Sequence, residues 1–259
     1  MKVLVIGDIM GEPGRRAVER RLPKLVAEHG IDLVVANGEN IAGGFGITPE
    51  LAEELFEWGA SVITTGNHAW DKKEIVDYMR REKRLLRPAN YPDGVPGQGS
   101  IVVESAGGEK LAVLHLMGRA FMMTLDCPFQ TARRELARLK KETPAVIVDM
   151  HAEATSEKMA MGHFLDGEVA AVVGTHTHVQ TADEQMLPKG TAYLTDIGMT
   201  GPIHSVIGIK KEIVLEKFLT GMPRRYEVAT GPAVFCAALV ELDARLGKAI
   251  SIQRIRIPD

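Results

Sequence analysis

The sequence predicts a layered α/β fold in which two mixed sheets pack on each other and helices flank them. Two observations lead to this expectation. Over the first two thirds of the chain, short β-branched runs alternate with helical stretches, which is typical of α/β folds. The last third is rich in strands and has one helical stretch, as expected if a second sheet packs on the first. No linker or internal repeat interrupts the chain, so we expect one domain over residues 1–259.

The predicted strands are short apolar runs in which valine and isoleucine are frequent. In the first two thirds of the chain they cover residues 2–7, 32–37, 61–66, 111–118, 145–151 and 169–176. In the last third they cover 191–198, 226–231, 233–242 and 249–257.

Helices are predicted at 14–29, 48–58, 72–82, 129–141, 155–164 and 210–220. The helix at 48–58 has the clearest start, because Thr48 can cap it and Pro49 suits its first turn. Pro23 lies within the first helix, so we expect a kink or a break there.

Composition narrows the class of protein. The chain is 45% hydrophobic and 25% charged, which is ordinary for a soluble globular protein. Its formal net charge of −3 gives no basic excess for bulk nucleic-acid binding, and two cysteines are too few for a disulfide framework. No signal peptide is recognisable, and no apolar run approaches the ~20 residues of a membrane span. We expect a cytoplasmic protein without a membrane partner.

Polar side chains follow five of the predicted strands, always at the carboxyl end. They are Asp8, Glu39, Asn40, Asn67, His68, His151, His176 and His178. Ligands of α/β sheets bind beyond the carboxyl ends of the strands, so these side chains are expected to meet. Taken singly, each has a plainer interpretation: Asp8 as a helix cap, Asn67 and His68 as a turn, or His151 as a core histidine. The two histidines at 176 and 178 alternate in a chain read as extended, so both would point to one side. The combination predicts a metal site.

The residue types limit the metal. None of the candidates is a cysteine, which excludes a thiolate zinc site, whereas carboxylate, amide and imidazole ligands suit iron, manganese or zinc. Even seven of these candidate ligands are too many for one ion that must also hold water and substrate. They suit two ions ~3.5–4 Å apart, bridged by one carboxylate. We expect two divalent or transition-metal ions per chain, with iron as the first choice and manganese or zinc as alternatives.

Five segments carry a family resemblance: "GDIMGEPGRRA", "ANGENIAGGFGIT", "TTGNHAWDKKEI", "DMHAEATSEKMAMG" and "VVGTHTHVQTAD". Together they resemble the YmdB-like branch of the calcineurin-like metallophosphoesterases. The chain departs from the wider superfamily as that branch does, because Met10 replaces a ligand histidine and Glu39 with Asn40 replaces an aspartate. The resemblance implies a four-layer α/β/β/α metallophosphoesterase sandwich.

The resemblance also implies roles for the site residues. Glu39 would bridge two ions. The first ion would be bound by Asp8, Glu39, Asn40 and His178, and the second by Glu39, Asn67, His151 and His176. His68 would not be a ligand. Hydroxide shared by the two ions would attack phosphorus in line, and His68 would protonate the departing alkoxide as general acid.

The expected activity follows from the same resemblance. We expect a phosphodiesterase that acts on small phosphodiesters, with 2′,3′-cyclic nucleotides as the leading candidates. One alternative is a phosphomonoesterase of the nucleotidase type. The other is a regulatory or RNA-associated protein that binds a phosphate ligand with little turnover. We also expect a homo-oligomer.

Overall fold

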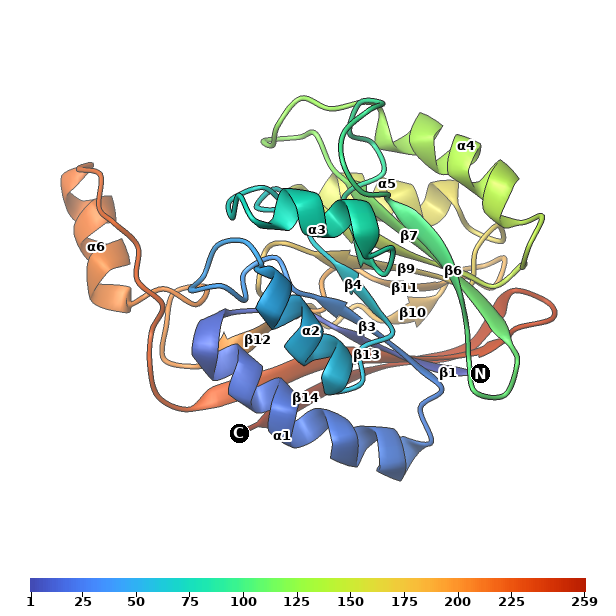
Figure 1. The fold of residues 1–259 in the computed structure, drawn as a ribbon, viewed down its shortest axis with the longest axis horizontal. Coiled ribbons are helices and arrows are strands. Elements are labelled where there is room, and N and C mark those ends of the chain that lie inside the picture. The colour runs from blue at the N-terminus through green and yellow to red at the C-terminus, as the bar shows by residue number, and fades with distance from the viewer.

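Two mixed β-sheets form the centre of the structure, a computed structural model that describes residues 1–259 (Figure 1). The strands of the first sheet are β1 (Lys2–Ile6), β2 (Asp8–Ile9), β3 (Leu33–Asn37), β4 (Val62–Thr64), β5 (Leu85–Leu86), β12 (Met199–Pro202), β13 (Ala233–Asp243) and β14 (Lys248–Pro258). Their order is β2-β12-β13-β1-β3-β4-β5, and β14 also pairs with β13. Strands β1, β3, β4 and β5 are parallel, whereas β13 is antiparallel to β1, β12 and β14.

The second sheet has the order β10-β11-β9-β8-β7-β6. Its strands are β6 (Ser100–Glu104), β7 (Lys110–Met117), β8 (Val146–His151), β9 (Ala171–Thr175), β10 (Gln185–Met186) and β11 (Ala192–Leu194). The four central strands are parallel, and the two edge strands are antiparallel to their neighbours.

The structure has six helices: α1 (Gly11–His29), α2 (Pro49–Glu57), α3 (Ile75–Arg81), α4 (Pro128–Leu139), α5 (Thr155–Phe164) and α6 (Lys211–Thr220). The first sheet packs its outer face on α1, α2 and α3, and the second packs its outer face on α4 and α5. An apolar layer between the sheets joins Val5 and Val35 to Val113 and Ile147. The predicted four-layer α/β/β/α arrangement is therefore confirmed. Helix α6 stands apart from the layers, at the left of Figure 1.

Several predicted boundaries differ from the observed ones. Residues 226–231 do not form a strand, and Val228 makes only one isolated bridge, to Ile209. The strand expected at 191–198 ends at Leu194, and the chain then turns before β12. Strand β6 was not predicted. A kink or a break was expected at Pro23. Helix α1 continues through Pro23, which excludes a break. Thr48 caps α2 as predicted, accepting a hydrogen bond from the Leu51 N–H.

No helix in the structure has both the length and the apolar character required to cross a lipid bilayer.

Candidate metal centre

The predicted site residues meet where the carboxyl ends of parallel strands from both sheets face each other. Asp8 lies just beyond β1, and the loops after β3 and β4 carry Glu39 with Asn40 and Asn67 with His68. From the second sheet, His151 ends β8, and His176 and His178 follow β9. Strands β1, β3 and β4 run in one direction within their sheet, as do β8 and β9 in theirs, so the polar ends of each set come together. All eight predicted residues are gathered in this region.

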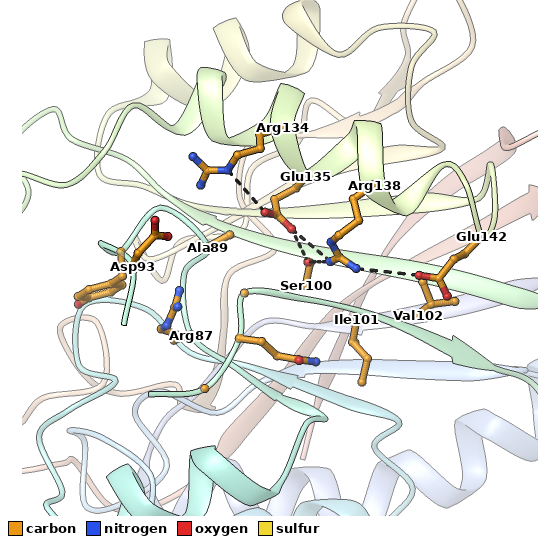
Figure 2. Close-up of a pocket in the computed structure, with 14 residues that line it drawn as sticks. Arg87, Ala89, Asp93, Ser100, Ile101, Val102, Arg134, Glu135, Arg138 and Glu142 are labelled. Atoms are coloured by element: carbon orange, nitrogen blue, oxygen red, sulfur yellow. Dashed lines mark hydrogen bonds and ion pairs between the residues drawn. The ribbon is translucent and has the colours of Figure 1, made fainter. Parts of the chain in front are cut away.

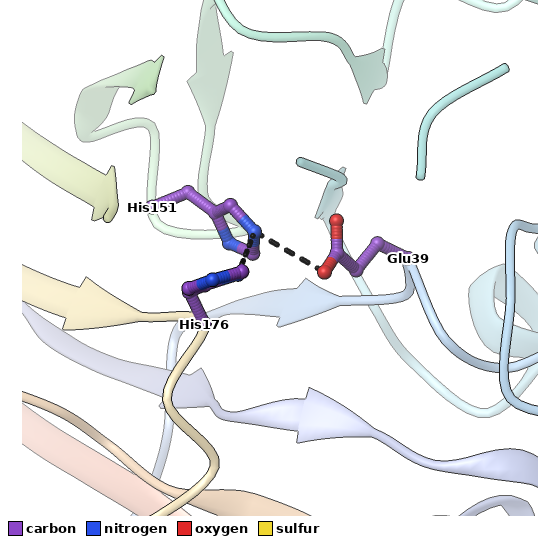
Figure 3. A group of neighbouring side chains, drawn as sticks. All are labelled: Glu39, His151 and His176. Carbon is purple, nitrogen blue, oxygen red and sulfur yellow. Dashed lines mark hydrogen bonds and ion pairs between the residues drawn. The ribbon is translucent and has the colours of Figure 1, made fainter. Parts of the chain in front are cut away.

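His151 Nε2 is the centre of a first group of ligand-type atoms. It lies 3.1 Å from Glu39 Oε1, 3.0 Å from Asn67 Oδ1 and 3.1 Å from His176 Nδ1. Figure 3 shows the side chains of Glu39, His151 and His176 pointing toward one another. One ligand atom from each of these three lies within 4.8 Å of the other two, which is close enough to share an ion.

A second group of ligand-type atoms also includes Glu39 Oε1. His178 Nε2 is 3.7 Å from Asp8 Oδ1 and 3.2 Å from Asn40 Nδ2, and the same Asn40 amide nitrogen is 3.2 Å from Glu39 Oε1. Asp8 Oδ2 accepts a hydrogen bond from the His176 N–H, but Asp8 Oδ1 is buried without any hydrogen-bond partner. Asn40 presents its amide nitrogen to this group, so binding an ion through its oxygen requires the amide to flip.

The three imidazoles are each fixed through the ring nitrogen that faces away from these groups. His151 Nδ1 lies 2.9 Å from the Thr175 hydroxyl, His176 Nε2 lies 3.1 Å from Glu153 Oε2, and His178 Nδ1 lies 2.9 Å from the Ile207 carbonyl oxygen. Metal-binding histidines characteristically donate their second ring N–H to such partners, which fixes the tautomer and the ring orientation. Thr175 in turn donates to the buried Asp149.

Charge within the site favours anionic Glu39 and neutral His176. Burial alone would raise the pKa of Glu39, but His151 outweighs burial and holds the pKa well below its usual range. Burial lowers the pKa of His151, yet attraction to Glu39 reverses this and raises it to about 9. Burial and repulsion from His151 lower the pKa of His176 to about 3, whereas burial raises the pKa of Asp8 to about 6.

The donor set fits a metal site. Asp8 Oδ1 is a buried carboxylate oxygen without a partner, and an ion beside it would satisfy it. Gly66 supplies a second observation, because a Cβ on this residue would lie 2.1 Å from Glu39 Oε2 and 2.3 Å from His151 Nε2. Only glycine leaves these ligand atoms free at this close approach of the backbone.

The turn that carries His176 and His178 is held by a buried ion pair. The sequence predicted an extended backbone here, and this prediction is wrong. His176 and His178 have φ angles of 96° and 66°, which are in the left-handed region. Thr177 between them donates from its N–H and its hydroxyl to Asp196 Oδ2, at 3.1 Å and 2.7 Å. The same oxygen accepts from Lys158 Nζ at 2.6 Å, and both charged side chains are buried.

His68 lies at the rim of the site, half-buried, with Nδ1 2.8 Å from Asp71 Oδ2. Its ring also makes an edge contact with Phe45, with centroids 5.1 Å apart and planes at 70°. Its backbone N–H lies 3.4 Å from Glu39 Oε2, so the ring is anchored beside the first group of ligand-type atoms.

A separate cavity of about 480 Å³ lies beside β6 and α4 (Figure 2). Several of its charged groups are already engaged. Arg138 contacts Ser100, Glu135 and Glu142, and Arg87 donates to backbone carbonyl oxygens. None of the predicted site residues lines it.

Comparison with known proteins identifies the family. The model of the YmdB-like protein family matches residues 4–255. The chain belongs to this family. A 2′,3′-cyclic-nucleotide 2′-phosphodiesterase from Bacillus subtilis is 47% identical over 100% of this chain and 98% of its own length. Among solved structures, a hypothetical protein from Thermus thermophilus has a TM-score of 0.94 and 46% identity, with both chains fully covered. A novel phosphatase from Mycoplasma pneumoniae has a TM-score of 0.93 and 36% identity, covering all of this chain and 93% of that one. The family resemblance inferred from the motifs is thus confirmed.

Sequence reasoning did not find the residues that hydrogen-bond to the candidate ligands, to His68 or to the turn between His176 and His178. Glu153 was detectable in principle, because it follows His151 by two residues. Asp71 follows His68 by three residues in the same way. Lys158 and Asp196 are 38 positions apart, and no local pattern relates them.

Proposed function

We propose that the chain is a binuclear metal-dependent phosphodiesterase that hydrolyses small phosphodiesters, namely 2′,3′-cyclic nucleotides. The observation that carries the proposal is the position of Glu39 Oε1, 3.1 Å from His151 Nε2 in one ligand group and 3.2 Å from Asn40 Nδ2 in the other. A carboxylate between two ligand groups suits the bridge of a two-metal hydrolase. The name and full-length similarity of the Bacillus subtilis relative support the substrate class.

The ligand groups suggest how two ions would be divided. One would be bound by Asp8, Glu39, Asn40 and His178, and the other by Glu39, Asn67, His151 and His176. Iron is our first choice, with manganese or zinc as alternatives, because the donors are carboxylate, amide and imidazole. When bound, two such ions supply a nucleophile from water near neutral pH and neutralise phosphate charge.

His68 is proposed as the general acid that protonates the leaving oxygen. Asp71 accepts from its Nδ1, so the carboxylate orients the ring and balances the charge of the imidazolium. Nε2 then carries the proton that the departing alkoxide needs.

Replacing His68 by alanine tests this assignment. His68→Ala is expected to keep both metals, and to lose ~10²–10⁴-fold in rate on a 2′,3′-cyclic nucleotide. The loss should be far smaller on a nitrophenyl diester, because nitrophenolate leaves without a proton. His163→Ala, which changes an exposed histidine on α5, is the matched control. Equal losses on both esters, or loss of a metal ion, would contradict the role.

A phosphomonoesterase is the second candidate, because relatives from Mycoplasma carry the names novel phosphatase and putative phosphatase/phosphodiesterase. The ratio of rates on a nucleoside monophosphate and a 2′,3′-cyclic nucleotide separates the two functions. A higher kcat/KM on the monophosphate would replace our first proposal with this one.

A further inference from the structure

The cavity at the candidate metal centre is lined in part by apolar and aromatic residues that the proposed chemistry does not use. The cavity measures about 390 Å³, within the range of about 300–1,000 Å³ that is usual for small-molecule sites. Its lining includes metal-ligand candidates and His68. It also includes Met10, Phe45, Ile207, Ile209 and Tyr226, which we call the apolar wall.

Phe45 is the member of the apolar wall nearest the proposed chemistry, since its ring contacts the His68 ring. It lies on a tight loop that approaches neighbouring side chains closely. Gly44 has a φ of 97°, and a Cβ there would lie 2.8 Å from Val228 and 3.2 Å from Met10. The loop thus presents an aromatic ring beside the residue that would protonate the leaving oxygen.

Ile207 is a strained residue in the same wall. Its φ of 46° is in the left-handed region, where a β-branched residue is a genuine outlier, and its side chain is 52% exposed. Such strain persists when the surrounding structure fixes it and is concentrated at functional sites. Its carbonyl oxygen contacts His178 Nδ1, so the position of this apolar side chain is coupled to a ligand candidate.

The apolar wall offers one polar side-chain group, the Tyr226 hydroxyl. The Tyr226 hydroxyl accepts a hydrogen bond from Lys217 Nζ at 2.5 Å, and the other four members have apolar side chains. Thr177, at the border of the cavity, directs its hydroxyl to Asp196. A ligand group against the apolar wall would therefore be bound mainly through its faces.

We propose that the apolar wall binds the base of the nucleotide by stacking and contact, with Phe45 as the main residue, and that it accepts different bases. This inference rests on the proposed phosphodiesterase function. In a 2′,3′-cyclic nucleotide, the base is attached to the carbon next to the one that bears O2′. An aromatic ring in contact with the proposed acid His68 is therefore within reach of the base when O2′ leaves. Stacking on an aromatic side chain tolerates every base, because every base has a π-face.

Two substrates that differ only in the base test the proposal. They are 2′,3′-cyclic AMP and the 2′,3′-cyclic phosphate of 1-O-methylribose, which has no base. Phe45→Ala should raise KM for cyclic AMP about 5- to 150-fold with little change in kcat, and should leave the base-free diester unaffected. Phe45→Tyr should restore KM. Phe218→Ala, on the exposed face of α6, is the matched control and should resemble the wild type.

Base tolerance gives a second arm. The four 2′,3′-cyclic nucleotides should have kcat/KM values within about tenfold of one another, because stacking on an aromatic ring discriminates weakly between bases. A difference far larger than this would show polar recognition of base edges and would overturn the tolerance.

Equilibrium binding tests the proposal independently of turnover. Adenosine 3′-monophosphate, measured by calorimetry, should bind Phe45→Ala more weakly than wild type by the same factor as the change in KM. Equal binding would refute the stacking role, and equal losses of kcat on both diesters would show that Phe45 only supports His68.

If wild type hydrolyses the base-free diester as well as cyclic AMP, the base site fails while the phosphodiesterase stands. If neither diester is hydrolysed by metal-loaded protein, the phosphodiesterase fails, and the calorimetry still decides whether Phe45 binds the base.

Discussion

Replacing Lys158 by methionine probes the ion pair behind the turn that carries His176 and His178. Lys158 is 1% exposed on α5, and its Nζ lies 2.6 Å from Asp196 Oδ2, which is also buried. Methionine retains most of the apolar stem and removes the charge. Asp196 would keep three donors after the change: the N–H and hydroxyl of Thr177 and the N–H of Gly198.

The magnitude follows from burial. Removing one partner of a buried ion pair costs about 3–5 kcal/mol, because the other charge stays buried. The three remaining donors to Asp196 favour the lower end, about 3 kcal/mol. For a chain of this size, each kcal/mol lowers Tm by about 2–4 °C, so we expect a fall of roughly 6–12 °C. Because Asp196 holds Thr177 between two ligand candidates, metal affinity should also fall by about 10–100-fold.

Two measurements check both effects. Thermal unfolding of the metal-free protein gives the loss of stability, and calorimetric titration with Mn²⁺ at a temperature well below Tm gives the affinity. Lys24→Met is the control, since Lys24 is exposed on α1. The reasoning is refuted if the Tm of Lys158→Met lies within about 2 °C of the wild-type Tm, well under the fall of ~6 °C expected, and if the variant binds Mn²⁺ with unchanged affinity.

Three further predictions concern the site and its surroundings. Elemental analysis should find close to two metal ions per chain in wild type. Glu39→Ala should lose both ions, and Asn67→Ala should lose one. A Glu39→Ala variant that keeps both ions at wild-type affinity would exclude the bridging role of Glu39. In metal-free protein the pKa of His151 is raised to about 9 against an ordinary value of 6.5, so its contribution to stability is complete below pH ~6.5 and is lost as pH rises through 9. Tm should therefore fall over this window in wild type and much less in His151→Asn, and parallel curves would contradict the assignment. Burial raises the pKa of Cys236 to about 11, so native protein at pH 8 should show one fast thiol, Cys127, and a second only after unfolding; two fast thiols would contradict the burial.

Much of the candidate site could be predicted because its signals are local. Each strand is a short apolar run, and each polar residue ends or follows one, so parallel strands gather these residues at one edge of each sheet. The packing of the two sheets then brings Glu39 and His151 together. The pattern failed where tertiary context decides. Residues 226–231 have the composition of a strand, but Val228 finds only a single bridge partner, Ile209. Two-residue strands such as β2 and β10 are too short to show a period.

The supporting residues could not be predicted, because their contacts are long-range. Lys158 would be read as a surface helix residue, and only the fold places Asp196 opposite it. Phe45 is similar: the glycine-rich loop was visible in the sequence, but the contact of its ring with His68 depends on the relative position of two loops.

The central position of β13 in the first sheet has a consequence for folding during synthesis. Strand β1 lies between β3 and β13, and Ile6 pairs with Ala237, while Asp8 pairs with Met199 of β12. A ribosome therefore releases the amino-terminal strand long before its partner from residues 233–243 exists. Such distant pairing slows folding, because the intervening loop must close first. While synthesis continues, the edge of β1 is an open template for other chains. We expect a nascent chain arrested before residue 233 to bind chaperones and no metal, since it lacks β13, the strand that pairs with both β1 and β12 in the sheet that positions Asp8.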